Sequence, residues 1–231
     1  MSLSHPSRVI ALLGAESTGK SDLAEVLCRR LRAVQPCTAV PEYLREWCDT
    51  QGRTPDPQEQ HHIAAEQRRR IEAALAQAPD MLVVADTTPL MTAVYSDFVF
   101  DDRSLYADAL RWQQQAVGLT LLTALDLPWL PDGLQRDGPQ VREPVDALIR
   151  GALASAGIAY GVVHGEGPRR VEAALRAVVR WQPRLAAALE ASPDEDATSG
   201  SRVRWRSRCL DCLDPDCERV LAGSVHRSVH R

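Results

Sequence analysis

Short apolar segments alternate along the chain with longer segments whose apolar residues recur every three or four positions. The apolar segments predict five β-strands, near residues 8–13, 38–41, 81–85, 119–125 and 159–163. The periodic segments predict five helices, near residues 20–34, 58–78, 102–115, 144–156 and 167–190. Strand-helix alternation of this kind favours an α/β fold. We therefore expect a doubly wound parallel sheet of about five strands, with helices on both faces.

The composition of the chain changes twice towards its C-terminus. Residues 1–190 carry the alternating pattern and are predicted to form one domain. Residues 191–201 are acidic, small and rich in helix-breaking residues, which predicts a linker. Residues 202–231 form a short tail that contains arginines and cysteines. Within the domain, the stretch from Pro131 to Glu143 holds Asp-Gly and Gly-Pro turn signals and predicts a polar loop.

Charge and cysteine content limit the classes of partner and compartment. The net charge of −4 gives no reason to expect a nucleic acid partner. No apolar run approaches the roughly 20 residues that span a bilayer, and the N-terminus lacks the regions of a signal peptide. Cys28, Cys37 and Cys48 are scattered and do not suggest a disulfide framework. We expect a cytoplasmic protein that binds no membrane, and the sequence leaves its oligomeric state open.

Lys20 is the only lysine among 27 basic residues, and it lies in a phosphate-binding motif. The motif follows the first predicted strand and opens the first predicted helix, where backbone N–H groups wrap nucleotide phosphates. A slim ammonium group reaches the β- and γ-phosphates from inside that wrap better than a planar guanidinium. The segment predicted to bind ATP consists of Gly14, Ala15, Glu16, Ser17, Thr18, Gly19, Lys20 and Ser21.

Acidic residues follow the second and third predicted strands. Glu42 comes after the second strand, where a carboxylate can take the proton of an attacking substrate hydroxyl, and Arg45 one turn later can neutralise phosphate charge. Asp86 ends the third strand, as expected of an acid that supports Mg²⁺ together with Ser21. A role in helix capping remains the alternative for both acids, and their two catalytic roles can also be exchanged.

Chemistry-bearing residues also follow the fourth strand. Asp126 and Trp129 are predicted to contact the substrate, since an exposed indole can stack on a planar ring. Arg136 and Arg142, in the predicted loop, can close over the ATP phosphates. The alternative is that Trp129 packs the loop and that the arginines are solvated charges.

The tail offers a separate candidate metal site. Cys209 and Cys212 have the spacing that chelates zinc, and Cys217 is a third soft ligand. A fourth ligand has to come from His226 or His230, and reduced thiols in a basic tail remain the alternative.

Four segments in order resemble the ribosylnicotinamide kinase domain of NadR-type proteins and the wider set of AAA-like P-loop ATPases and kinases. They are GAESTGKS, PEYLREW, DTTPLMTAVYS and DLPWLPDG, and the resemblance spans about residues 8–185. It implies transfer of the ATP γ-phosphate to the 5′-hydroxyl of nicotinamide riboside. Related deoxynucleoside kinases place a glutamate base after the second strand, which favours Glu42, and lid arginines in the family correspond to Arg136 and Arg142.

The chain departs from full-length NadR-type proteins. The first strand begins near residue 8, without a helix-turn-helix segment before it, and His164 to Gly167 is only a partial match to the H-x-G-H motif of adenylyltransferases. We therefore expect the kinase step alone.

The sequence predicts an ATP- and Mg²⁺-dependent nucleoside kinase with a small-molecule acceptor. Its predicted catalytic residues are Lys20, Glu42, Asp86, Arg136 and Arg142. Two alternatives stay open: an ATPase of the same family that acts on a partner protein, and a nucleotide-sensing binding module.

Overall fold

The computed structural model describes residues 7–130 and 138–191. In this part of the chain, five strands form one parallel sheet in the order β2-β3-β1-β4-β5. The strands are β1 (Val9–Leu13), β2 (Cys37–Val40), β3 (Leu82–Asp86), β4 (Val117–Thr123) and β5 (Gly161–Val163). The predicted α/β class and the five-stranded parallel sheet are confirmed.

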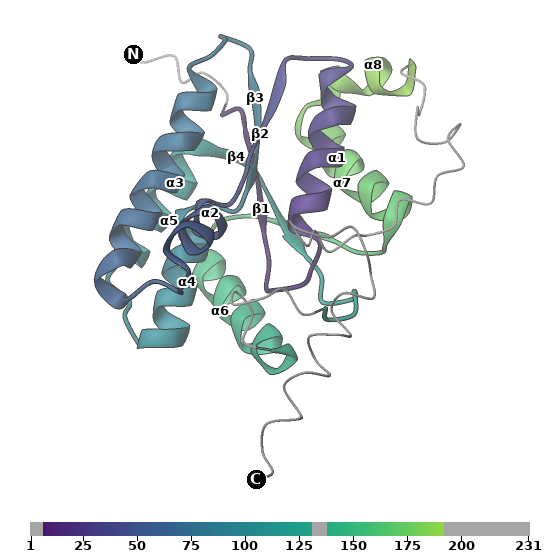
Figure 1. Ribbon diagram of the computed structural model, residues 1–231. Helices are drawn as coiled ribbons and strands as arrows, with labels where there is room; N and C mark the ends of the chain where they lie inside the picture. The colour runs from purple at the N-terminus through teal and green to yellow at the C-terminus, as the bar shows by residue number, and fades with distance from the viewer. Residues whose placement is uncertain (1–6, 131–137, 192–231) are drawn as a thin grey trace. The chain divides into compact units, whose positions relative to one another are not determined.

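Helices cover both faces of the sheet (Figure 1). Helices α1 (Lys20–Arg32), α7 (Gly167–Trp181) and α8 (Ala186–Ala191) lie on one face. Helices α3 (Gln60–Leu75), α4 (Pro89–Phe100), α5 (Tyr106–Ala116) and α6 (Arg142–Ser155) lie on the other. Helix α2 (Tyr43–Gln51) is short and packs against α3. Because both faces are covered, every residue of β1 and β3 is buried, as expected for inner strands of a parallel sheet.

The order of the strands creates a crevice at their carboxyl ends. From β1 the chain crosses through α1 to β2, whereas from β3 it crosses through α4 and α5 to β4 on the other side of β1. Neighbouring strands whose connections leave in opposite directions form the switch point where such sheets bind ligands. The segments that follow β1 and β3 therefore border the expected binding crevice.

Helix α4 was not predicted from the sequence. Its residues from Pro89 to Val94 are all buried, so the segment shows no polar face from which a helical period can be recognised. Pro89 occupies the first turn of α4, where its missing N–H costs nothing. The predicted helix near 102–115 begins later, at Tyr106.

The predicted polar loop between Pro131 and Glu143 is shorter than expected. A 3-10 turn covers Pro139–Val141, and α6 begins at Arg142 rather than at residue 144. Val141 and Val145 are buried, and their packing against the core extends the helix towards the loop. Arg142 consequently lies in the first turn of a helix and not in a loop.

Candidate active site

The phosphate-binding motif connects β1 to α1, as predicted. Gly14, Ser17 and Gly19 have φ angles of 155°, 55° and 68°, so the loop takes backbone conformations that most residues avoid. The Thr18 hydroxyl donates to the Ala15 carbonyl at 2.8 Å, and Lys20 Nζ donates to the same oxygen at 2.8 Å. Lys20 is thus folded over the loop that is expected to hold phosphate.

A buried arginine that was not predicted from the sequence donates a hydrogen bond to the backbone of this loop. Arg170 of α7 has no exposed surface, and its Nη2 donates to the Thr18 carbonyl at 2.6 Å. Its Nη1 donates to Asp126 Oδ1 at 2.9 Å and to the Gly165 carbonyl at 2.6 Å. The available signal was an arginine among the apolar residues on the buried face of a helix. Arg170 therefore joins the phosphate loop to the segments after β4 and β5.

Asp126 is engaged in this same cluster. Its second carboxylate oxygen accepts the Gly165 N–H at 2.6 Å. Burial acts to raise the pKa of the Asp126 carboxyl, but the Gly165 N–H and Arg170 outweigh burial and hold the pKa below its ordinary value. Because both oxygens have protein partners, we propose that Asp126 supports the phosphate loop rather than binding substrate.

Asp86 ends β3 as predicted, and it is 4% exposed. Burial, followed by the charge of Glu42, raises the pKa of Asp86 to about 6, against the opposing effects of Lys20, the Ser21 hydroxyl and Arg45. Ser21 forms a side-chain hydrogen bond with Asp86, whereas the buried Oδ1 of Asp86 has no hydrogen-bond partner. A buried carboxylate with an unused oxygen beside a hydroxyl fits a hard cation such as Mg²⁺. The N-cap position of α4 belongs to Thr88, so helix capping does not explain Asp86.

Glu42 lies between β2 and α2, directly before the first residue of α2. It makes no side-chain capping hydrogen bond, so its side chain does not cap the helix. One oxygen accepts from Arg45 Nε at 3.1 Å, and the Glu42 side chain is 15% exposed. The structure therefore brings Lys20, Glu42 and Asp86 to the carboxyl edge of three adjacent strands.

A pocket of about 250 Å³ lies beside these residues and has both charged and apolar walls. Helix α4 contributes one apolar face, on which Val99 is 50% exposed. Mostly apolar lining with a few charged groups is typical of small-molecule sites. The charged lining residues are Glu16, Lys20, Glu42, Arg45 and Asp56. The other lining residues are Leu44, Cys48, Thr54, Pro55, Gln60, Met91, Tyr95, Val99 and Phe100. The α4 residues were not predicted as site residues, because the helix itself was not predicted.

Arg142 and Trp129 are not among the residues that line this pocket. Arg142 is 8% exposed, and its buried Nε and Nη2 have no hydrogen-bond partner. Burial lowers the pKa of Arg142, while Asp126 opposes this effect. Trp129 is partly buried with an unpartnered Nε1, and the adjacent Leu130 N–H donates to Ser17 Oγ of the phosphate loop at 2.7 Å. Arg136 lies outside the described residues.

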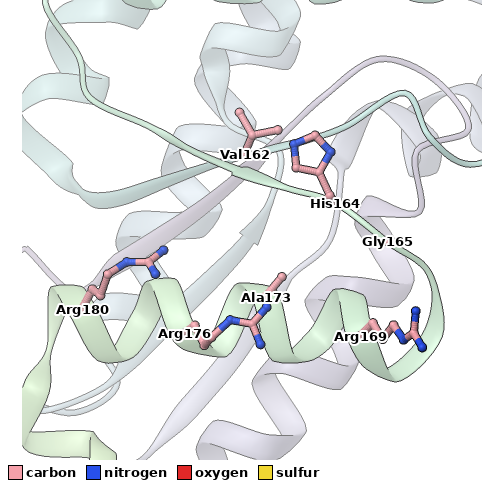
Figure 2. Close-up of a pocket in the computed structure, with 7 residues that line it drawn as sticks. All are labelled: Val162, His164, Gly165, Arg169, Ala173, Arg176 and Arg180. Carbon is pink, nitrogen blue, oxygen red and sulfur yellow. The ribbon is translucent and has the colours of Figure 1, made fainter.

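A larger cavity, of about 390 Å³, contains none of the predicted site residues. Figure 2 shows that it lies between the β5 segment and α7. It is lined by Val162, His164, Gly165, Arg169, Ala173, Arg176 and Arg180. Since the phosphate loop borders the smaller pocket, the smaller pocket is the candidate active site.

The zinc prediction cannot be placed, because Cys209, Cys212 and Cys217 lie outside the described residues. Within residues 7–130 and 138–191, no group of three or more histidine, cysteine or acidic residues is arranged to hold a metal ion. Cys28, Cys37 and Cys48 are free, buried thiols. In the same two ranges, no helix has the length and apolar character needed to cross a membrane.

Comparisons with known proteins agree with this geometry. A family model described as an AAA domain matches residues 9–170. Two NadR protein structures are similar: one in complex with NR, at a TM-score of 0.62 and 17% identity, and one in complex with NAD and AMP-PNP, at 0.60 and 19%. Each likeness covers 78% of this chain and 51% of the NadR chain, so this chain spans about half their length. At such identities the likeness shows the fold alone. No curated protein matches the sequence.

Replacing Asp86 with asparagine should stabilise the metal-free protein above pH 6. Because the pKa of Asp86 is raised from 3.8 to about 6, the folded state binds this proton more tightly than the unfolded state does. The stability that proton binding contributes is lost as the pH rises through about 6. By that shift, Asp86→Asn should increase the free energy of unfolding by up to about 3 kcal/mol at pH 8, and by little near pH 4.

Denaturant unfolding with EDTA across this pH range measures the effect, and Asp80→Asn, at an exposed position, is the control. A variant that is less stable than the native chain at pH 8 contradicts the prediction.

Replacing Arg142 with methionine should weaken nucleotide binding without destabilising the fold. The substitution removes a buried charge whose Nε and Nη2 have no protein acceptor, and it keeps most of the side-chain volume. We expect unchanged or higher thermal stability and about a tenfold or greater loss of ATP affinity, measured by calorimetry.

Arg150→Met in the same helix is the matched control. Arg150 Nε bonds Asp146 at 2.6 Å, so this variant should lose some stability and bind ATP normally. Equal ATP affinity of the Arg142 variant and the native chain would rule out the phosphate contact.

Proposed function

The chain belongs to the AAA domain family, and we propose that it is an ATP-dependent nucleoside kinase whose acceptor is nicotinamide riboside. The observation that carries the proposal is the pocket, whose lining includes Lys20 of the phosphate loop, Glu42 and the aromatic residues Tyr95 and Phe100. A cation for the phosphates of ATP, a base and a surface for a planar ring thereby border the same pocket. The NadR structure in complex with NR supports this choice of acceptor.

The charges of the pocket favour an acceptor that carries no phosphate. Glu16, Glu42 and Asp56 supply three carboxylates against the two cations Lys20 and Arg45. Arg45 is bonded to Glu42, and Lys20 is bonded to the loop. An anionic acceptor would therefore meet unfavourable charge, whereas the positively charged ring of nicotinamide riboside would be attracted to carboxylates and to aromatic faces.

In the proposed reaction Glu42 accepts the proton of the 5′-hydroxyl. The hydroxyl oxygen forms a bond to the γ-phosphorus, the bond from that phosphorus to the bridging oxygen breaks, and ADP leaves. Lys20 stabilises charge on the β- and γ-phosphates, and Arg142 offers two unused donors for phosphate oxygens. Glu42 rather than Asp86 is assigned as the base, because Glu42 lines the pocket and Asp86 is not among its lining residues.

Asp86 and Ser21 are the residues that would hold Mg²⁺. When bound, the cation neutralises phosphate charge. The raised pKa of Asp86 and its unpartnered Oδ1 fit a carboxylate that gains its partner with the metal nucleotide.

The protein should convert nicotinamide riboside and ATP to nicotinamide mononucleotide and ADP. Chromatography of the reaction products measures this, with guanosine and shikimate as control acceptors. The acceptor should stimulate ATP consumption strongly, which separates a kinase from an ATPase that acts on a partner and from a sensor that only binds. ATP consumption that no nucleoside stimulates would contradict the kinase assignment, and stimulation by a different nucleoside would replace the acceptor.

Replacing Glu42 with glutamine should lower kcat about 10²–10⁴-fold while leaving ATP affinity nearly unchanged, because a positioned base acts on the chemical step. Lys20→Ala, in contrast, should raise the KM for ATP and lower kcat together. Lys20→Arg should not restore activity, since the loop encloses a smaller head group.

Steady-state kinetics with varied ATP and acceptor measures both parameters. Asp49→Asn, which changes an exposed carboxylate on α2, the helix that directly follows Glu42, is the control and should behave like the native chain. A Glu42→Gln variant that loses only a few-fold in kcat would remove Glu42 from the base role.

A further inference from the structure

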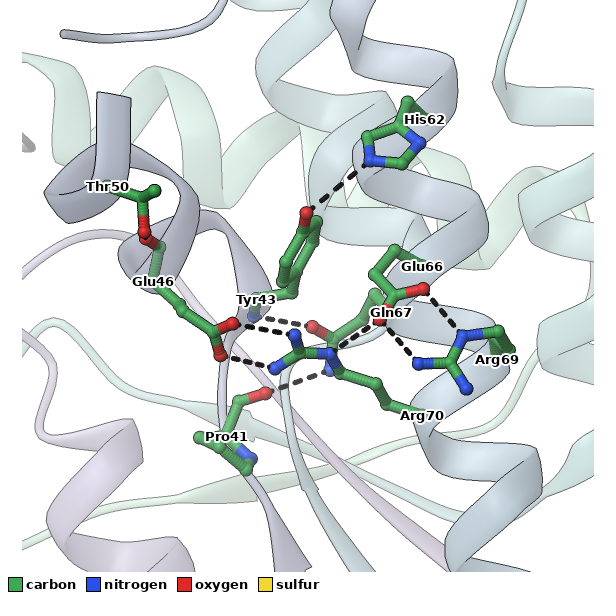
Figure 3. Close-up of polar contacts among 9 residues, drawn as sticks. All are labelled: Pro41, Tyr43, Glu46, Thr50, His62, Glu66, Gln67, Arg69 and Arg70. Carbon is green, nitrogen blue, oxygen red and sulfur yellow. Dashed lines mark hydrogen bonds and ion pairs between the residues drawn. The ribbon is translucent and has the colours of Figure 1, made fainter. Parts of the chain in front are cut away.

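Gln67 is a buried residue of α3 whose side-chain amide bonds to the backbone on each side of Glu42 and to the backbone after Asp86. It is 2% exposed. Its Oε1 accepts the Tyr43 N–H at 2.7 Å, and its Nε2 lies 3.3 Å from the Pro41 carbonyl and 3.5 Å from the Thr87 carbonyl. Figure 3 shows the amide between Pro41 and Tyr43. Both polar atoms of the Gln67 side chain therefore bond to backbone just beyond the ends of β2 and β3.

These contacts begin where the sheet stops. Strands β2 and β3 are paired up to Val40 and Ala85. Pro41 has no N–H with which to continue the ladder. Thr87 has a φ of 73°, which turns the chain out of the strand direction. Gln67 thus connects the segments that follow β2 and β3, immediately beyond the last backbone pairing of these strands. Glu42 and Asp86 lie at these same two positions.

The two carboxylates need such a connection. Glu42 lies between Pro41 and Tyr43, Asp86 precedes Thr87, and the charge of Glu42 acts on Asp86. Like charges at neighbouring strand ends push those ends apart. Thr87 also holds a conformation that is costly for a β-branched residue and persists only when its surroundings enforce it.

Other contacts between α3 and α2 are more exposed. Arg70 Nη1 bonds Glu46 Oε2 at 2.5 Å, and its guanidinium lies 4.3 Å from the centre of the Tyr43 ring. The Glu46 side chain is 57% exposed, so water and salt weaken this pair. Among the described residues, Gln67 supplies the buried polar contact that reaches both strand ends.

We propose that Gln67 is a positioning residue that fixes the spacing of Glu42 and Asp86 for phosphoryl transfer. The proposal rests on the proposed kinase function. Gln67 does not line the pocket and acts through the backbone on each side of Glu42.

The first experiment is a kinetic comparison of two buried glutamine variants. Gln67→Met keeps the shape of the side chain and removes its hydrogen bonds. Gln113→Met is the matched control, because Gln113 is 1% exposed and bonds the hydroxyls of Thr88 and Thr120 instead of the strand ends at Glu42. We expect Gln67→Met to lower kcat about 10–100-fold with less than a threefold change in the KM for ATP. Gln113→Met should keep kcat within about threefold of the native value.

A double variant separates positioning from general loss of structure. If Gln67 acts through Glu42, adding Gln67→Met to Glu42→Gln should lower kcat by less than about threefold further, because the base is already absent. Losses that multiply in the double variant, or a KM for ATP that rises with the fall in kcat, would overturn the proposal.

Hydrogen exchange provides a readout that does not depend on the reaction. Gln67→Met should increase amide exchange at Tyr43 by at least tenfold and leave the phosphate loop protected. Gln67→Glu, which keeps an acceptor for that amide, should preserve its protection and serves if the methionine variant does not fold. Unchanged exchange at Tyr43 in Gln67→Met refutes the connection even when the native chain accepts no nucleoside, whereas an inactive native chain with the expected exchange refutes only the kinase assignment.

Discussion

The conformation of the phosphate loop depends on where its carbonyl oxygens find donors. Backbone N–H groups can face a phosphate only if the intervening carbonyls face away, and buried carbonyls need partners. The Thr18 carbonyl receives Arg170, and the Ala15 carbonyl receives the Thr18 hydroxyl and Lys20. A fully buried guanidinium is tolerated only when it is paired, and Asp126 provides that charge. The Arg170–Asp126 pair therefore stabilises the conformation of the loop through residues that do not line the pocket.

Two other buried charged residues of the candidate site have atoms without a hydrogen-bond partner. Asp86 keeps a buried oxygen without a donor, and Arg142 keeps two buried nitrogens without an acceptor. Each of these groups costs stability in the unliganded protein. In the proposed function, a bound metal nucleotide would supply a cation to Asp86 and an anion to Arg142. Arg170 is also buried and charged, but both of its Nη atoms bond to protein and only its Nε lacks a partner, so most of its donors support the fold.

The features that the sequence predicted are those determined by contiguous residues. A run of apolar residues ending in Asp86, and a glycine motif ending in Lys20, specify a strand and a loop locally, so their positions could be predicted. Arg170 bonds to Thr18, 152 positions away, and Gln67 bonds to Thr87, 20 positions away, and nothing near them in the sequence identifies those partners. Asp126 illustrates the same limit: its place at a strand end was predictable, but its pairing with Arg170 depended on how α7 packs. Helix α4 was missed because its first six residues are buried on all sides, which removes the periodic signal.

The two ends of the proposed reaction are built from different parts of the chain. The phosphate end comes from the loop after β1 and from the residues that end or follow β2 and β3, whose positions are fixed by backbone pairing and by Arg170 and Gln67. The acceptor end comes from one face of α4 and from Thr54 to Asp56, where side chains alone determine shape and charge. Substitutions at Tyr95 or Phe100 can therefore alter which ring is accepted without disturbing the phosphate loop. The identity of the acceptor is consequently less constrained by the fold than the phosphoryl-transfer chemistry.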